Sequence, residues 1–407
     1  DLDRLRVQKP DARRRRDIFV DLEFKRLAER YAAEAIAPAV DAPGESAEKP
    51  APAPEQTGDR GARHVVSSPE EAARLAARLS QCGRFAVAAE ASDPDPLRGE
   101  LVGLAVAMEP SDAWYLPFGH TAPFTLTFEG EDRGRPRNLP RLDSAAMAAF
   151  REVLEDPNVA KIGHDLKHVA LALSRVGVTL RGEVFDAMVG SYVLDPGRRG
   201  HGLDVLAVEF LGRKAPGREN VVGSGRNKVP FAEASVERAR DLLCENAELA
   251  LLLEGRIAPE MGREGLAGLD ATLEIPLLRV LTRMEMAGIA IDEDFFRAMR
   301  SRLKRELDLI QEEIFKVAGT EFNLNSTPQL REILFGKLGL PVLKKTKTGA
   351  STDASVLEEL AAEGHELPRL LLEYRELEKL RSTYVDALPQ LVNPRTGRIH
   401  TSFNQTV

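Results

Sequence analysis

A short basic segment, residues 344–349, has the residue types needed to contact a phosphate backbone. It contains three lysines, two threonines and a glycine, and no acidic residue lies between Pro341 and Thr352. Lysines supply point charges for phosphate groups, and small hydroxyl side chains donate to phosphate oxygens. An isolated run of this kind is usually a solvent-exposed turn, so the basic segment alone leaves both interpretations open.

Two histidines in the middle of the chain are the next candidates for chemistry, as ligands of a metal ion. His164 and His168 are four residues apart, a spacing that could suggest a metal site. A zinc site needs at least three protein ligands, and no third ligand with a clear role accompanies this pair. The sequence therefore predicts no metal site here.

Two short helices are predicted to position the basic segment, over Pro328–Leu338 and Ser355–Leu360. Ser326 or Thr327 is the expected N-cap of the first helix, because Pro328 then falls at its first position. The apolar residues of this helix recur at helical spacing and predict one buried face.

Composition excludes several classes of protein. The chain has 407 residues, of which 43% are hydrophobic and 29% charged, and its net charge is −8, so any nucleic-acid surface must be a local patch. Its two cysteines, Cys82 and Cys244, are far apart, which favours a reducing cytosol over a disulfide framework. No apolar run is long enough for a transmembrane helix, so no membrane partner is expected.

The chain divides into four segments by composition. Residues 1–35 are predicted to be helical but too short for a core. Residues 36–62 are rich in Ala, Pro, Glu and Gly and predict an extended linker. Residues 63–256 combine short apolar runs with helical stretches, which predicts a mixed sheet covered by helices. Residues 266–407 are predicted to be mainly helical, starting with a helix over Leu269–Met286.

Several motifs in the C-terminal third resemble those of the family A DNA polymerases, the bacterial DNA polymerase I type. In order they are FNLNS at 322–326, QLREILFGKLGL at 329–340, the basic segment, STD at 351–353, EYR at 373–375, KLRSTYVD at 379–386 and NPRTGRIHTSFNQTV at 393–407. The resemblance implies an α/β fold class. It assigns a ribonuclease H-like 3′–5′ exonuclease-type domain to 63–256 and the start of a polymerase domain, with a mainly helical thumb, to 266–407. By the same likeness, 1–35 is the tail of a 5′ nuclease domain.

The resemblance also specifies what an exonuclease site requires. In the family, four carboxylates hold two divalent metal ions and a tyrosine orients the attacking water. Only Glu90 keeps a carboxylate here, and the other positions are Ala88, Val169, Leu242 at the tyrosine position, and Asn246. Each divalent ion needs several anionic oxygens, so the resemblance predicts a degenerate site without metal and without proofreading.

Neighbouring carboxylates leave an alternative, an active 3′–5′ exonuclease. In that case Asp165 or Glu248 would turn inward and rebuild a weak site beside Glu90, with Glu245 also nearby. The favoured interpretation makes Asp165 a helix N-cap and places the two glutamates on a solvated helix face.

The resemblance further implies a surface that binds primer–template duplex without recognising its sequence. The types of these residues suit contacts to the DNA backbone. The expected DNA-binding residues are Asn323, Asn325, Ser326, Lys344, Lys345, Lys347, Lys379, Arg381, Ser382, Thr383, Arg398, His400, Thr401, Asn404 and Gln405.

Polymerase catalysis is expected to lie outside this sequence. In the family, the aspartates that hold two Mg²⁺ ions, and the helix that binds deoxynucleoside triphosphates, follow the position of Val407. The sequence is therefore expected to be a fragment, inactive alone, of a monomeric, cytoplasmic, nucleoid-associated bacterial enzyme of DNA replication and repair. A non-catalytic DNA-binding protein remains a further alternative.

Overall fold

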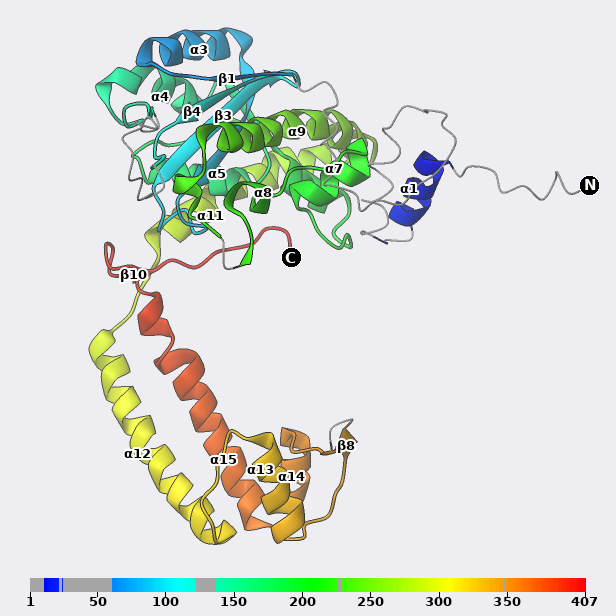
Figure 1. Cartoon of the computed structure of the whole chain (residues 1–407), viewed down its shortest axis with the longest axis vertical. Coiled ribbons are helices and arrows are strands. Elements are labelled where there is room, and N and C mark those ends of the chain that lie inside the picture. The colour runs from blue at the N-terminus through cyan, green and yellow to red at the C-terminus, as the bar shows by residue number, and fades with distance from the viewer. Residues whose placement is uncertain (1–10, 22–23, 25–60, 122–136, 226–227, 347–348) are drawn as a thin grey trace, which may run out of the picture. The chain divides into compact units, whose positions relative to one another are not determined.

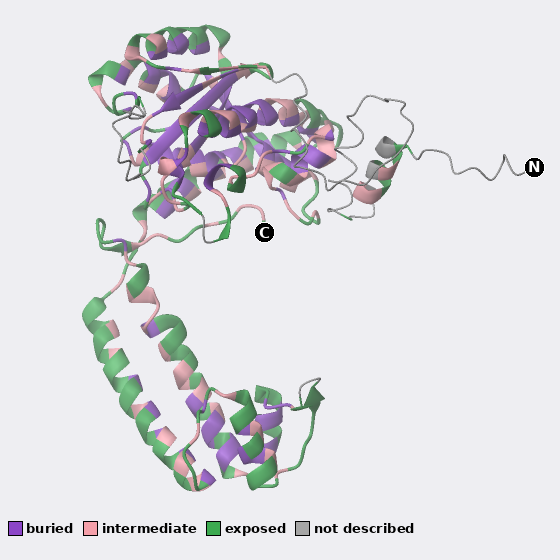
Figure 2. Ribbon diagram, viewed as in Figure 1, coloured by how far each residue is buried: buried purple, intermediate pink, exposed green. Residues whose placement is uncertain are grey.

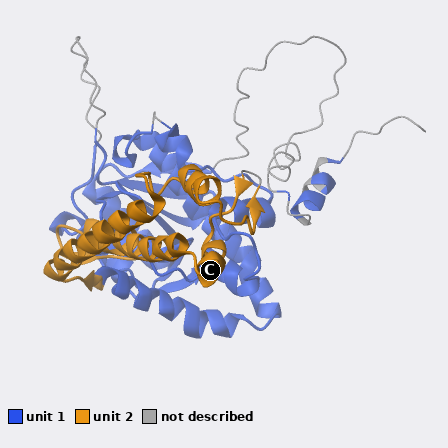
Figure 3. Cartoon of the chain, turned by 90° about the horizontal axis from the view of Figure 1, so that it is seen from below, with its two compact units in different colours: residues 1–286, 402–407 blue, residues 287–401 orange. Residues whose placement is uncertain are grey.

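The computed structural model describes residues 11–21, 24, 61–121, 137–225, 228–346 and 349–407. The chain forms two compact units (Figure 3): unit 1 comprises residues 1–286 and 402–407, and unit 2 comprises residues 287–401. The expected linker lies outside the described residues except for its last two positions. Within 1–35, the described part is essentially helix α1, Ala12–Asp21.

A six-stranded mixed sheet is the centre of unit 1 (Figure 1). Its spatial order is β1-β4-β3-β2-β5-β6; β2–β3 and β3–β4 are antiparallel and the other pairs are parallel. The strands are β1 (Ala62–Val65), β2 (Arg84–Ala91), β3 (Leu101–Glu109), β4 (Asp112–Pro117), β5 (Ala160–Gly163) and β6 (Glu183–Asp186). This confirms the predicted mixed sheet.

Helices cover both faces of this sheet, which explains why its central strands are buried on both sides (Figure 2). Along β2, Phe85 and Val87 pack into the core beneath α3, α4 and α5, while Ala86 packs into the core beneath α7 and α9. In the described residues between β1 and the end of α9, the helices are α3 (Pro69–Cys82), α4 (Ala148–Glu155), α5 (Leu166–Ser174), α6 (Ala187–Leu194), α7 (Leu203–Leu211), α8 (Glu219–Val222) and α9 (Val236–Arg263), with 3₁₀ turns at Ala145–Met147 and Phe231–Glu233.

The end of unit 1 departs from the single helix expected over Leu269–Met286. A π-helical turn, Asp270–Glu274, interrupts it between α10 (Ala267–Leu269) and α11 (Ile275–Ala287). Hydrophobic periodicity does not distinguish a π turn from α-helix, so the sequence pattern could not locate it.

Residues 402–407 return to unit 1 and are held there by a buried ion pair. Lys167 donates to Glu285 and to the carbonyl of Phe403, and the Phe403 amide donates to Glu285 at 2.8 Å. Gln405 also donates to the backbone carbonyl of Glu274 at 3.0 Å. Unit 2 is therefore an insertion in the sequence of unit 1.

Unit 2 is mainly helical, as expected for its sequence. A short ladder of β7 and β10 joins its two ends, and its core lies between α12, α13, α14 and α15. Its elements are β7 (Ile289–Ala290), α12 (Glu293–Ala318), α13 (Thr327–Arg331), a π turn (Glu332–Lys337), β8 (Lys345–Thr346), β9 (Gly349–Ala350), α14 (Ala354–Ala362), α15 (Glu366–Leu380), a second π turn (Arg381–Val385), a 3₁₀ turn (Leu388–Leu391) and β10 (Arg398–Ile399). None of the helices in the described ranges is long and apolar enough to cross a membrane.

Candidate functional site

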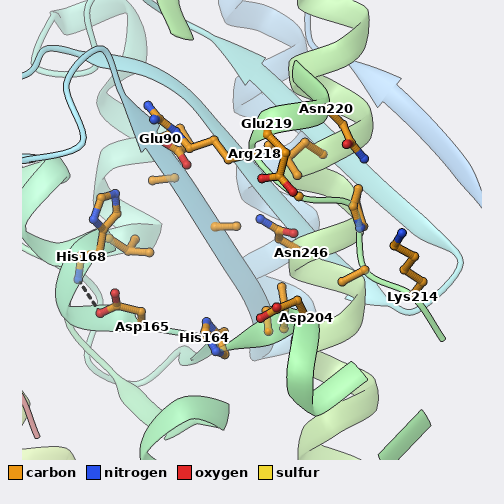
Figure 4. Close-up of a pocket in the computed structure, with 18 of the residues that line it drawn as sticks. Glu90, His164, Asp165, His168, Asp204, Lys214, Arg218, Glu219, Asn220 and Asn246 are labelled. Atoms are coloured by element: carbon orange, nitrogen blue, oxygen red, sulfur yellow. Dashed lines mark hydrogen bonds and ion pairs between the residues drawn. The ribbon is translucent and has the colours of Figure 1, made fainter. Parts of the chain in front are cut away.

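A cavity of about 570 Å³ lies in unit 1 (Figure 4). Strand β2, the start of α5, helix α7, helix α9 and the loop before α8 supply its walls. The five positions expected to form the degenerate exonuclease site all line it: Ala88, Glu90, Val169, Leu242 and Asn246. The sequence interpretation thus grouped residues that the fold brings together from three separate elements.

Glu90 faces an arginine inside this cavity rather than open solvent. Arg218 donates from Nε to Glu90 Oε2 at 3.3 Å, and the side chains are 27% and 16% exposed. Burial raises the pKa of Glu90, while the charges of Arg218 and His168 oppose that rise. The only carboxylate retained at the five positions is therefore already paired with a cation.

Asp165 is bound to backbone amides near its own position. It caps α5 by accepting from the His168 amide at 3.2 Å, and it is the only non-glycine residue with a positive φ, 56°, in the described ranges. The buried carboxylate of Asp186 accepts from the amides of Asp165 at 3.1 Å and Leu166 at 2.6 Å. The expected capping role of Asp165 is confirmed.

The expectation of a solvated face for Glu245 and Glu248 is wrong. Both residues of α9 are buried and pair with Arg63 of β1, at 3.2 Å and 3.1 Å. Burial raises the pKa of Glu248, and the charge of Arg63 opposes this effect. Sequence reasoning missed the pair because Arg63 is more than 180 residues away from both glutamates in the chain.

The positions expected to bind DNA lie on several elements of the chain. The Asn323 side chain accepts from the Asn325 amide at 2.9 Å in the turn that leads into α13. Lys344 and Lys345 are exposed near the β8–β9 hairpin, and Lys344 Nζ lies 3.4 Å from Asp353 Oδ2. Lys347 lies outside the described residues.

The other expected DNA-binding positions lie at the end of α15, in the π turn that follows it, in β10 and directly after β10. Arg381 pairs with Glu378 at 2.7 Å, and the Ser382 hydroxyl donates to the Glu378 carbonyl; Lys379 and Thr383 are exposed beside them. Arg398 donates to the Gly288 carbonyl at 3.1 Å. His400 and Thr401 also belong to unit 2, whereas Asn404 and Gln405 belong to unit 1.

Comparison with known proteins assigns both units. A sequence model described as DNA polymerase family A matches residues 293–407, and one described as 3′-5′ exonuclease matches residues 63–236. The chain is 35% identical over 334 residues to a DNA polymerase I of Pseudomonas aeruginosa, covering 81% of this chain and 35% of that protein. It is 39% identical over 333 residues to a DNA polymerase I of Rhizobium leguminosarum, covering 79% and 32%.

The chain belongs to DNA polymerase family A. It spans about a third of the length of these curated relatives. A solved structure agrees, namely the POL domain of Pol1 from M. smegmatis in complex with DNA primer-template and dNTP. Its TM-score to this chain is 0.64 at 30% identity, and the match covers 84% of this chain and 53% of that one.

Exonuclease domains of this family generally use divalent metal ions, so the side chains of the cavity can be compared with the ligands that such ions need. Ala88, Val169 and Leu242 provide no oxygen ligand from their side chains, and Asn246 provides a neutral amide. In the part of the chain that the structure describes, no three His, Cys, Asp or Glu residues are grouped as metal ligands. Hard cations take several oxygen ligands, so the five positions do not fit a two-metal site.

Sequence reasoning also missed Arg218, the residue that contacts Glu90. The two residues are 128 positions apart, and an arginine in a glycine-rich loop gives no periodic signal. Only the fold brings the loop before α8 next to β2.

Proposed function

We propose that this chain is the exonuclease-like and thumb portion of a DNA polymerase I that acts in DNA replication and repair. In this proposal, unit 2 holds the primer–template duplex, and the domain at 63–256 is a scaffold without proofreading activity. The observation that carries the loss of proofreading is the cavity itself. Of the five expected exonuclease positions in its wall, only Glu90 keeps a carboxylate, and Arg218 is bound to that carboxylate.

Exposed polar residues of unit 2 support the duplex-binding part of the proposal. Lys345, Lys379 and Thr383 are exposed, and their types suit phosphate oxygens rather than base edges. A polymerase must accept every sequence, so contacts that position the backbone are more useful to it than contacts that discriminate bases. The solved relative, whose title names a complex with DNA primer-template, also supports this part.

The remaining parts of the function belong to the parent polymerase. We infer that Mg²⁺ and deoxynucleoside triphosphates bind to residues outside this sequence and that the chain alone does not extend primers. We also infer a monomeric protein of the bacterial cytoplasm, because the relatives are bacterial polymerases.

A salt titration tests duplex binding by the basic segment. Replacing Lys344, Lys345 and Lys347 by Ala should weaken binding of a primer–template duplex. It should also reduce the slope of log K against log salt by about 0.9 for each phosphate that the variant no longer neutralises. The matched control replaces Lys228, an exposed lysine of unit 1, by Ala. An unchanged slope in the triple variant would contradict the role of the basic segment.

A primer-trimming assay tests the loss of proofreading. The full chain is incubated with a mispaired primer end and Mg²⁺ or Mn²⁺, and no trimming is expected. Trimming that requires metal and disappears in Glu90→Ala would refute the scaffold role and establish the alternative, an active exonuclease.

A further inference from the structure

We propose that Arg218 is the resident cation of the cavity: its guanidinium takes the place beside Glu90 that a divalent metal ion would need. Arg218, and not only the loss of carboxylates, then prevents the cavity from holding metal. This inference rests on the proposed function, because it explains why a degenerate exonuclease site does not bind the divalent metal ions that an active site of this kind needs.

The backbone at Arg218 is held in place, which fixes the point from which its side chain starts. Its carbonyl accepts from the amides of Val221 at 3.0 Å and Val222 at 3.1 Å, so Arg218 is held at the start of α8. Val221 and Val222 are themselves buried in the core of unit 1. The stem of Arg218 therefore begins at an ordered position in the fold.

Two partners hold the guanidinium itself. Glu90 accepts from Nε at 3.3 Å on one side, and the ring of Phe231, a fully buried residue, lies 5.5 Å from the guanidinium carbon. Figure 4 shows Glu90 and Arg218 together at one end of the cavity, with Asn246 between that end and the opposite wall. An anion and an aromatic face are both favourable partners for a guanidinium.

Charge makes this arrangement incompatible with a metal ion at Glu90. A guanidinium in a protein cannot be deprotonated, so its positive charge is permanent at every pH at which the chain is folded. A divalent ion bound to Glu90 would lie within a few ångströms of that charge, inside a partly buried cavity where repulsion is poorly screened. Metal binding would thus require Arg218 to leave both of its partners.

A second cation in the wall offers a matched comparison. Lys214 also lines the cavity, but it is exposed, and it lies on the far side from Glu90 in Figure 4. If general positive charge excluded metal, Lys214 would matter as much as Arg218. If the contact with Glu90 excludes it, only Arg218 matters.

The test restores the carboxylates and then removes each cation in turn. The full chain receives Ala88→Asp, Val169→Asp and Asn246→Asp, and Mn²⁺ binding is measured by electron paramagnetic resonance and calorimetry. Adding Arg218→Met to this restored variant should increase Mn²⁺ affinity at least 10-fold. Adding Lys214→Met should change it less than 3-fold. Thermal unfolding confirms that each variant is folded.

Two results would overturn the proposal. One is equal Mn²⁺ affinity of the restored variant with and without Arg218→Met, and the other is no Mn²⁺ binding by the folded variant that contains Arg218→Met. Should the triple replacement unfold, Ala88→Asp alone gives two carboxylates on one face of β2, and the same comparison of Arg218→Met with Lys214→Met applies. Neither result bears on the scaffold role, which fails only if the native chain trims primers.

Discussion

The buried ion pair between β1 and α9 gives the sharpest stability prediction. Arg63 is 6% exposed and lies 3.2 Å from Glu245 and 3.1 Å from Glu248, which are 10% and 2% exposed. Replacing Arg63 by Met leaves these carboxylates buried without this partner, and the expected loss of unfolding free energy is about 3–5 kcal/mol at pH 8. For a unit of this size, the corresponding decrease in Tm is roughly 6–20 °C.

The loss of unfolding free energy in Arg63→Met should increase as the pH rises. Burial already raises the pKa of Glu248, and removing Arg63 removes the charge that opposes this rise. The folded variant then binds a proton more tightly than the unfolded chain. Its stability is therefore retained at low pH and lost as the pH rises through the folded pKa, so the loss should be smaller at pH 5 than at pH 8.

Urea unfolding, followed by circular dichroism at both pH values, measures this effect. Arg84→Met is the matched control, since Arg84 also joins a strand to a glutamate of α9, Glu254, but is 54% exposed. An exposed pair of this kind contributes about 0.2–1 kcal/mol. A loss in Arg63→Met no larger than in this control, or a loss that grows toward pH 5, would refute the reasoning.

Three further predictions concern unit 1. Lys167→Met should speed amide exchange in residues 402–407 roughly 10-fold or more, measured by mass spectrometry, because it removes hydrogen bonds from a charged donor. Gly103→Ala should cost roughly 1–3 kcal/mol in urea unfolding, because an added Cβ would lie 1.9 Å from the Tyr115 hydroxyl oxygen. Burial, with nearby Asp186, raises the pKa of Asp270 to about 6, so this carboxyl group should contribute a fall in stability of up to about 3 kcal/mol between about pH 4 and pH 6, and Asp270→Asn should remove that contribution.

A control variant accompanies each of these three predictions. Lys214→Met should leave exchange in the returning segment unchanged, and equal exchange in Lys167→Met would contradict the clamp. Gly255→Ala, where an added Cβ meets open space on α9, should be neutral or stabilising by up to about 1 kcal/mol. An equally small effect of Gly103→Ala would contradict the predicted clash. Asp195→Asn, at a 54% exposed side chain, should keep the fall between pH 4 and pH 6.

Local sequence rules predicted much of unit 1 because its signals act over a few residues. Ser68 and Glu71 are spaced as a capping box, and in the structure the Ser68 hydroxyl accepts from the Glu71 amide at 3.3 Å. Ala88 and Glu90 are two residues apart on one strand, so their common position in the cavity also followed from the alternation of side chains along a strand.

Pairings across long sequence separations could not be predicted in the same way. Neither Arg63 nor Arg218 carries a local signal that identifies its partner, and the glutamates on α9 were expected on the solvated face because charged residues usually are. The return of residues 402–407 to Lys167 likewise depends on the tertiary fold, since nothing in their short polar sequence specifies where they pack.

The return of residues 402–407 also sets an order of events during synthesis. Lys167 and Glu285 emerge from the ribosome before unit 2, but the Phe403 groups that complete their cluster emerge only after it. Translation of the 115 residues of unit 2, 287–401, takes about 6–23 s at a typical rate of about 5–20 residues per second. During that interval, Lys167 and Glu285 of the nascent unit 1 lack their hydrogen bonds to Phe403. Slow synthesis through unit 2 would therefore prolong the time for which chaperones and proteases can reach the incompletely folded unit 1.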